Sequence, residues 1–452
     1  MKFRLMAAAA ACVLCLAGAT SAMAASAHFV PPPNSLRALA AKVGLRIGTA
    51  ANPDDLTNTA FSTITSGQFS VLTPENAMKW QSVEPQEGVF NWTDADNLVN
   101  YAEAHGQLVR GHTLVWHNQL PNWLTQGVAE QDASGGCSSG AAGCITDSQL
   151  MDLLHQHITT EVSRYRGRIW QWDVVNEMLT DSNPSQINPN DFWISHLGTG
   201  IIADAFRWAH AADPHALLCY NDYNIAGEDG SNAKFNAAFS MIKGMLAEGV
   251  PISCVGDQGH LDLQFGFNPI QMTQDLQQYA SLGLKVAITE ADVRTFVETA
   301  DSNQNPIVGP TINVPNDTLV NLPGGGTQTL PAGSTFPAAN ASLTLNTATT
   351  VNVPGGSPVS LPAGATLPDA QASHPVTTAE ASWYDEMLQS CLQVSQCISF
   401  TVWGFDDSES WVPGTFGGEG SADLYDVNLN PKPAYTALQQ TLEMAAAGTQ
   451  QH

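Results

Sequence analysis

IWQWDVVNEM, residues 169–178, is the stretch that decides the fold. Its first residues are mostly branched or aromatic, as in a buried β-strand, and the polar residues Asn176 and Glu177 come at its end. Alternation along a strand predicts Val175 and Glu177 on one side and Asn176 on the other. The same order, an apolar run that ends in chemically capable side chains, recurs along the chain.

Seven other runs have this form, and segments with helical periodicity lie between them, for example at 151–166 and 233–249. Strands that alternate with helices predict a parallel sheet, and eight repeats favour closure into a (β/α)8 TIM barrel over a doubly wound open sheet. The polar residues favour the barrel as well, because active sites of that fold gather at the carboxyl ends of its strands. The seven runs are LRIGTA (45–50), FSVLTPE (69–75), LVRGHTLVW (108–116), ALLCYNDY (216–223), ISCVGDQGH (252–260), KVAITEADV (285–293) and CISFTVWGF (397–405).

One stretch, from about 300 to 373, breaks this rhythm, because it is rich in Pro, Gly, Thr and Asn and carries almost no charge. It contains two similar segments, VNLPGGGTQTLPAGSTFP (320–337) and VNVPGGSPVSLPAGATLP (351–368), at a spacing of 31 residues. Pro-Gly turns between short alternating runs predict a β-rich insertion after the seventh strand, and a disordered linker is the alternative. Two copies are too few for a solenoid, so such hairpins have to pack on the barrel or on each other.

The N-terminus has the form of a secretory signal over residues 1–24: Lys2 and Arg4, then an apolar run, then Ala22-Met23-Ala24 as a cleavage site. A membrane anchor is the alternative, but the apolar run is short for a span of roughly 20 residues and no stop-transfer pattern follows. We therefore expect residues 25–452 to form one exported domain, secreted or periplasmic, without a membrane anchor.

Cleavage at that site leaves 14 basic against 42 acidic residues, a formal charge of −28. This charge repels nucleic acid and anionic membranes, whereas a neutral or weakly charged substrate is compatible with it. Six cysteines remain, and an even number in an exported chain predicts disulfides. Among the residues left after cleavage no CxxC or HExxH spacing occurs, so we expect no zinc site. Proximity suggests, among many possible pairings, Cys137 with Cys144, Cys391 with Cys397, and Cys219 with Cys254.

Two carboxylates end different runs, Glu177 the fourth and Glu290 the seventh. A single Glu at a strand end is more often a structural group. Two carboxylates facing each other across a barrel mouth, however, are what cleavage of a glycosidic bond requires, one to protonate the leaving oxygen and the other to attack or stabilise the sugar cation. A separation of about 5 to 5.5 Å predicts retention of configuration and about 6.5 to 9.5 Å predicts inversion, and the sequence leaves this distance open.

Other side chains at the same strand ends suit sugar binding, either as hydroxyl partners or as flat aromatic platforms. Core packing explains any one Trp and a structural hydrogen bond explains any one His, but together at the exits of one barrel they indicate a binding site. They are Glu75, Asn76, Lys79, His112, Trp116, Gln258, His260, Trp403 and Trp411.

Taken together, these motifs resemble glycoside hydrolase family 10, whose typical members are endo-β-1,4-xylanases. The resemblance covers the barrel from about Val43 to Leu442. It is carried by GTA (48–50), TPENAMKW (73–80), RGHTLVWH (110–117), WDVVNE (172–177), YNDYN (220–224), GDQGHL (256–261), ITEADV (288–293) and WGFDDSESW (403–411).

The resemblance implies that the chain hydrolyses internal β-1,4 bonds of xylan and xylo-oligosaccharides with retention, by double displacement. It implies Glu177 as acid/base and Glu290 as nucleophile, with Asn176 at the sugar 2-hydroxyl and with His260 and Asp292 keeping the nucleophile ionised. It also matches Cys391 with Cys397 to a family disulfide. No metal or organic cofactor is needed, and we expect a monomer. The implied residues on the non-reducing side are Glu75, Asn76, Lys79, His112, Trp116 and Gln258, with Trp403 and Trp411 as platforms over the same sugars.

The chain departs from the family pattern at Ala291, where a larger aliphatic residue is usual, at Val412, where a basic residue is frequent, and in the insertion. We hypothesise that the insertion borders the leaving-group side of the cleft, because loops after barrel strands shape that face. A barrel β-glucanase or cellulase is one alternative function. A polysaccharide-binding protein with an inactive barrel is another, although the presence of both carboxylates argues against it.

Overall fold

The computed structural model describes residues 29–137, 143–228, 230–263, 265–296 and 379–449, together with short segments between 311 and 365. The signal peptide expected at residues 1–24 lies outside these ranges. Within them, none of the helices combines the length and the apolar character that crossing a bilayer requires.

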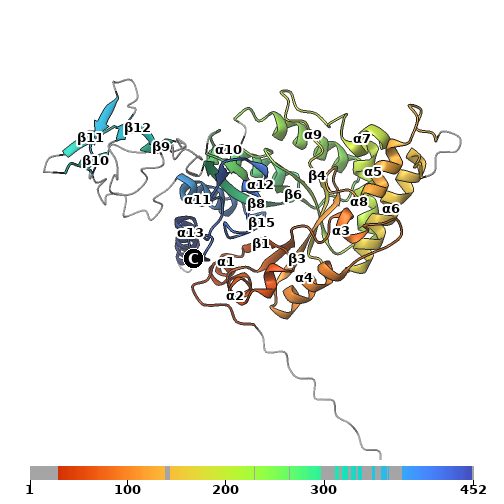
Figure 1. Cartoon of the computed structure of the whole chain (residues 1–452), viewed down its shortest axis with the longest axis horizontal. Coiled ribbons are helices and arrows are strands. Elements are labelled where there is room, and N and C mark those ends of the chain that lie inside the picture. The colour runs from red at the N-terminus through yellow and green to blue at the C-terminus, as the bar shows by residue number, and fades with distance from the viewer. Residues whose placement is uncertain are drawn as a thin grey trace, which may run out of the picture.

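Eight parallel strands close into a barrel with helices around it (Figure 1). The ring closes because β15 pairs with β1 on one side, where Ile47 lies opposite Phe400, and with β8 on the other, where Phe400 lies opposite Ile288. The predicted (β/α)8 barrel is confirmed, and each of the eight predicted runs contains one barrel strand. These strands are β1 (Arg46–Ala51), β2 (Val71–Pro74), β3 (Leu108–Val115), β4 (Gln171–Asn176), β5 (Leu217–Asp222), β6 (Cys254–Asp257), β8 (Lys285–Phe296) and β15 (Cys397–Val402).

Several helices begin at residues that cap them. Asn58 accepts hydrogen bonds from the first backbone amides of α2, Asp191 does the same for α7, and Asn268 precedes Pro269 at the start of α10. The helical elements are α1 (Leu36–Lys42), the 3-10 helix η1 (Asp55–Thr57), α2 (Thr59–Gln68), α3 (Trp80–Val83), α4 (Thr93–Ala104), α5 (Asn122–Ala129), α6 (Asp147–Arg164), α7 (Phe192–Leu197), α8 (Gly200–Ala212), α9 (Ala233–Ala247), α10 (Pro269–Ser281), α11 (Ala379–Leu392), α12 (Val412–Thr415) and α13 (Pro433–Thr449).

The last part of β8 belongs to a small ribbon of three strands at the mouth of the barrel. It pairs in parallel with β7 (His260–Asp262) and antiparallel with β16 (Glu419–Gly420). The insertion follows β8, which is the seventh barrel strand, as the sequence predicted. The insertion therefore directly follows the part of β8 that belongs to this ribbon.

The described parts of the insertion form three antiparallel strand pairs, two of which are hairpins, and Figure 1 draws β9 to β12 to one side of the barrel. Val320 and Leu330 of one hairpin and Val351 and Leu361 of another are buried in one cluster, separate from the barrel core. Equivalent positions of the two similar segments, 31 residues apart, therefore share this small core. The pairs are β9 (Thr311–Val314) with β12 (Ser334–Pro337), β10 (Thr318–Asn321) with β11 (Thr327–Leu330), and β13 (Thr349–Val351) with β14 (Val359–Leu361).

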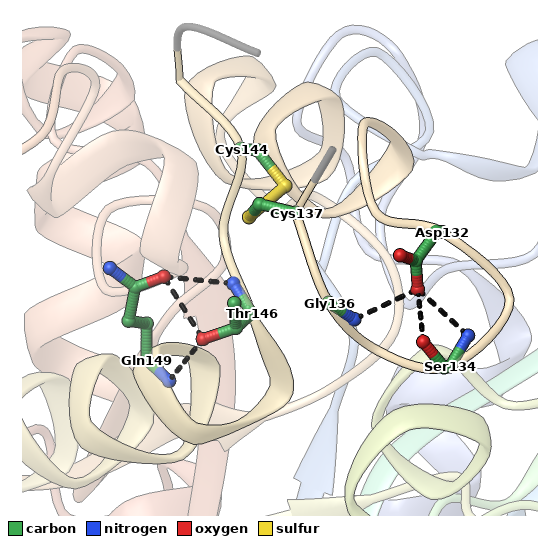
Figure 2. Close-up of a disulfide and its surroundings, with 7 residues drawn as sticks. All are labelled: Asp132, Ser134, Gly136, Cys137, Cys144, Thr146 and Gln149. Carbon is green, nitrogen blue, oxygen red and sulfur yellow. Dashed lines mark hydrogen bonds between the residues drawn. A yellow bond between two sulfur atoms is a disulfide. The ribbon is translucent and has the colours of Figure 1, made fainter. Parts of the chain in front are cut away.

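Three disulfides are present, in the pairing expected from the sequence: Cys137 with Cys144, Cys219 with Cys254, and Cys391 with Cys397. The first lies between α5 and α6, beside the capping box of Thr146 and Gln149 that begins α6 (Figure 2). The second joins residues that lie opposite each other on β5 and β6, and the third joins the end of α11 to the start of β15.

The first two disulfides should differ in their effect on stability, because they close loops of different length. Their sequence separations are 7 and 35 residues. Loop-closure entropy predicts a loss of about 2.5 kcal/mol in the free energy of unfolding when Cys137 and Cys144 are both replaced by Ala, and of about 4 kcal/mol when Cys219 and Cys254 are. Urea denaturation of the two double variants measures both values, and a larger loss for the first variant would contradict this explanation.

Candidate active site

The carboxyl ends of the barrel strands surround a cleft of about 950 Å³. Among the predicted site residues, all but Asp292 line it: Glu75, Asn76, Lys79, His112, Trp116, Asn176, Glu177, Gln258, His260, Glu290, Trp403 and Trp411. Asp292 lies behind them, in contact with His260. Lining residues that the prediction did not include are Asn118, Gln119, Tyr223, Asn224, Glu228, Leu261, Asp262, Phe265, Gly266, Arg294, Thr415 and Phe416.

Glu290 is almost completely buried, with 3% of its surface exposed, and it accepts hydrogen bonds at both oxygens. Asn221 Nδ2 at 2.7 Å and Arg110 Nη2 at 3.1 Å contact Oε1, and His260 Nε2 lies 3.3 Å from Oε2. Burial alone would raise the pKa of Glu290, but His112, His260 and Arg110 together outweigh it and hold this pKa well below its ordinary value. Glu290 is therefore ionised at neutral pH.

His260 is held between two carboxylates. Its Nδ1 lies 2.8 Å from Asp292 Oδ2, and Trp411 Nε1 donates to the same oxygen at 2.7 Å. Burial disfavours the imidazolium, but Asp292 and Glu290 raise the pKa of His260 to about 10. Near neutral pH both of its ring nitrogens thus carry protons, and one of them points at Glu290.

Three residues of this network were not predicted: Arg110, Asp173 and Asn221. Arg110 is 1% exposed, pairs with Asp173 and donates to the Thr289 carbonyl at 2.9 Å, while His112 Nδ1 lies 2.8 Å from Asp173 Oδ2. A sequence signal existed for Arg110 and Asp173. The motifs RGHTLVWH and WDVVNE place these charged residues inside apolar strands, where a charge needs a partner.

Glu177 follows the last residue of β4 and has a φ of 58°, in the left-handed region. Its Oε2 accepts a hydrogen bond from Trp116 Nε1 at 2.8 Å, and its Oε1 accepts one from Gln258 Nε2 at 2.9 Å. Gln258 also contacts Asn176 Oδ1 at 3.3 Å, so Asn176 and Glu177 meet the same side chain. The predicted alternation of these two residues is wrong, because the strand ends at Asn176 and the backbone turns at the next residue.

A chain of hydrogen bonds links the two carboxylates across the cleft. From Glu177 it passes through Gln258 to Asn176, whose Oδ1 accepts from Asn221 Nδ2 at 2.8 Å, and the same Asn221 nitrogen contacts Glu290. Glu177 and Glu290 therefore belong to one side-chain network in one cleft.

The predicted sugar-binding residues after β2 and β3 also form one group. Glu75 accepts from Asn52 Nδ2 at 2.8 Å, and Asn76 Oδ1 accepts from Lys79 Nζ at 3.2 Å. Lys79 Nζ lies 4.9 Å from the centre of the Trp116 ring. Burial lowers the pKa of Lys79, although the nearby carboxylates oppose the shift. Fixed donors, acceptors and aromatic faces thus occupy this end of the cleft, as sugar recognition requires.

Comparison with known proteins assigns the chain to a family. The sequence model of "Glycosyl hydrolase family 10" matches residues 35–310 and 365–441. The chain belongs to glycosyl hydrolase family 10. The unmatched gap falls within the insertion. This family 10 chain is thus a glycoside hydrolase, and its barrel carries an extra β-rich segment.

Relatives and solved structures agree with this assignment. The chain is 32% identical to endo-1,4-beta-xylanase B of Thermotoga neapolitana, over 90% of this chain and 91% of that protein. It is 30% identical to an endo-1,4-beta-xylanase of Agaricus bisporus, over 89% and 93%. The crystal structure of native xylanase 10B from Thermotoga maritima superimposes with a TM-score of 0.66 at 32% identity, over 92% of this chain and 99% of that one.

The environment of His260 predicts a pH-dependent stability of this family 10 hydrolase. The pKa of about 10 in the folded state exceeds the ordinary value of 6.5, so the stabilisation is complete below about pH 6.5 and is lost as the pH rises towards 10. In full it is on the order of 5 kcal/mol, at about 1.4 kcal/mol per pKa unit.

We expect His260→Asn to remove this part of the pH dependence. Urea denaturation of both proteins at several pH values between 6 and 10 measures it, and the difference between them isolates His260 from other groups that titrate in this range. Parallel pH profiles for the two proteins would contradict the assigned charge of His260.

Proposed function

We propose that this protein is an endo-1,4-β-xylanase that cleaves internal bonds of xylan with retention, with Glu177 as acid/base and Glu290 as nucleophile. The observation that carries the proposal is the contrast between two carboxylates in one cleft. Glu290 contacts the cations of Arg110 and His260, whereas the donors recorded on Glu177 are the neutral groups of Trp116 and Gln258. A nucleophile has to stay ionised and a proton donor has to hold a proton, so the two environments support these roles.

In the first step, Glu290 attacks the anomeric carbon while Glu177 donates its proton to the oxygen of the leaving sugar. The bond between the two sugars breaks, and a covalent glycosyl-enzyme forms. In the second step, Glu177 takes a proton from water, the water oxygen attacks the same carbon, and Glu290 leaves. Two inversions give net retention, and membership of family 10 supports this path.

Neighbouring residues support the two steps. His260, fixed by Asp292, keeps a proton directed at Glu290 and disfavours its protonation. The recorded hydrogen bonds of Asn176 use its oxygen, so its amide nitrogen is left to donate to the 2-hydroxyl of the sugar beside the cut. We propose that Glu75, Asn76, Lys79, His112, Trp116, Gln258, Trp403 and Trp411 bind the sugars on the non-reducing side.

The substrate is inferred from the names of the relatives, which are endo-1,4-beta-xylanases, and from the Thermotoga petrophila RKU-1 xylanase 10B solved with xylobiose, 31% identical with a TM-score of 0.66. A β-glucanase or cellulase is the alternative, since room for a hydroxymethyl group near Glu75, Lys79 and Trp403 separates glucose from xylose. Hydrolysis of glucuronoxylan, followed by NMR of the anomeric protons and compared with carboxymethylcellulose, tests substrate and stereochemistry together. Faster cleavage of the cellulose, or release of inverted products, would contradict the proposal.

The remaining features of the chain fit an exported enzyme. We propose that residues 1–24 are a signal peptide, that residues 25–452 form the catalytic barrel, and that 300–373 is an insertion within it. Three disulfides support an oxidising destination, outside the cell or in the periplasm. We further propose that the enzyme acts as a monomer on neutral polysaccharide, without a metal or organic cofactor. The two-carboxylate reaction needs neither.

A further inference from the structure

The ribbon of β7, β8 and β16 forms one wall of the cleft, and Arg294 lies at its centre. Asp262 of β7 lies opposite Arg294, and β16 pairs with β8 at the two residues that follow. Arg294 Nη2 contacts Asp262 Oδ2 at 3.1 Å, and its Nε contacts Glu419 Oε2 at 2.8 Å. Each neighbouring strand thus supplies one carboxylate, and the two together fix the guanidinium and more than offset its positive charge.

The fixed guanidinium of Arg294 stacks on an aromatic ring. Its Cζ lies 3.9 Å from the centre of the Phe416 ring, and Phe416 in turn packs edge to face on Trp411, at 5.4 Å between ring centres. Both Arg294 and Phe416 line the cleft. They form a flat, rigid surface without net positive charge, which suits the apolar face of a sugar ring rather than an anion.

Phe265 stands on the other side of β8 from Phe416, after β7, and it also lines the cleft. Its side chain is 80% exposed, although its backbone is held in a turn by a hydrogen bond from its amide to the Asp262 carbonyl at 3.0 Å. A solvent-exposed aromatic ring on the wall of a cleft is typical of a binding surface. Ile270 on α10 is similarly exposed, at 71%, but it does not line the cleft.

The barrel topology gives the direction of this wall. Glu177 follows β4 and Glu290 lies on β8, so a polysaccharide that passes between them runs from the loops after β1 and β2 to those after β5 and β6. Glu75 and Lys79 follow β2 at one end, whereas Phe265 follows β6 and β7 at the other. Since the first end is proposed to bind the non-reducing side, the wall of Phe265 and Arg294 lies on the leaving-group side.

We propose that Phe265, with the stacked pair of Arg294 and Phe416, forms an outer binding site on the leaving-group side. The site binds an undecorated xylose unit of the leaving chain that lies farther from the cleaved bond than the first sugar of that chain. This proposal rests on the proposed xylanase function. The site accepts a neutral ring, because Arg294 already has two carboxylate partners. It therefore favours long substrates over short ones.

The test uses Phe265→Ala in the full chain, with xylohexaose labelled at its reducing end. We expect kcat/KM on xylohexaose to fall about tenfold, with kcat/KM on xylotriose unchanged, since a trimer does not reach an outer site. Loss of a leaving-side contact favours registers with fewer sugars beyond the cut, so the labelled product should become shorter. Phe265→Trp keeps a flat ring and should restore the wild-type pattern, and Ile270→Ala is the matched control for loss of an exposed apolar side chain.

The outcomes separate this inference from the proposed function. If the wild-type enzyme cleaves xylohexaose but Phe265→Ala leaves rate and product length unchanged, the outer site is wrong and the xylanase function stands. A longer labelled product would also overturn it, because Phe265 would then bind the non-reducing side. If the wild-type enzyme cleaves no xylo-oligosaccharide, the proposed function itself fails.

Discussion

Replacing Glu290 by Ala should reduce kcat on xylan on the order of 10⁶-fold, the scale seen when the nucleophile of a covalent mechanism is removed. Glu290 contacts Asn221, Arg110 and His260, and no other carboxylate among the described residues contacts all three. The covalent intermediate therefore cannot form at another group. Steady-state hydrolysis of xylohexaose measures the loss, and calorimetry with the same oligosaccharide should still detect binding, because the sugar-contacting residues remain.

Azide provides the sharper readout for the Glu290→Ala variant. A small anion that enters the space of the missing carboxylate attacks the anomeric carbon directly, so an activated aryl xylobioside should give a glycosyl azide of inverted configuration, identified by NMR. Glu228→Gln is the control, since Glu228 is another buried acidic residue that lines the cleft, and this variant should keep most of its activity. Hydrolysis at the wild-type rate by Glu290→Ala would remove Glu290 from the mechanism.

Much of the fold was predictable because the signal is local. Each barrel strand is a short run of branched and aromatic residues, and each is followed by polar side chains, as at Glu75 and Glu290. In a closed parallel barrel all such ends face one rim, so strand order alone gathers the candidate site residues there. This reasoning needs no knowledge of which side chains touch.

The residues that were missed depend on contacts between distant strands. Arg110 reaches Glu290 across 180 positions of sequence and Asn221 reaches it across 69, and no local pattern encodes either contact. The turn at Glu177 was missed for a different reason, because a left-handed residue after a strand ends the period of two on which the alternation argument depends. Strand patterns thus predict which segments meet, but not which donors hold the reacting groups.

The ribbon of β7, β8 and β16 is a second case in which contacts between distant segments could not be predicted from the sequence. Asp262, Arg294 and Glu419 come from three separate parts of the chain, and the insertion lies between the last two. By contrast, the repeat of 31 residues was visible in the sequence, and its equivalent positions Val320 and Val351 are buried together. Repetition within a segment is readable from sequence alone, whereas pairing across a long insertion is not.

Replacing Glu177 by Ala should separate substrates by the quality of their leaving groups. A sugar hydroxyl leaves only when it is protonated, so kcat/KM on xylan should fall by about 10² to 10⁴-fold, the usual contribution of general acid catalysis. A dinitrophenyl xylobioside releases a stable anion without protonation, so its kcat/KM should remain within about tenfold of wild type. Initial rates on the two substrates, measured with one enzyme preparation, give the ratio directly.

The Glu177→Gln variant controls for packing, because its amide oxygen can still accept the hydrogen bond that Trp116 Nε1 gives to the carboxylate. If the acid/base role is correct, Gln should be as defective on xylan as Ala, since neither variant supplies an acidic proton. Azide should accelerate the second step of Glu177→Ala and yield a glycosyl azide of retained configuration, opposite to that from Glu290→Ala, because Glu290 still forms the covalent intermediate. Equal losses on xylan and on the aryl substrate would instead indicate that Glu177 positions the sugar, and the two carboxylates would need other roles.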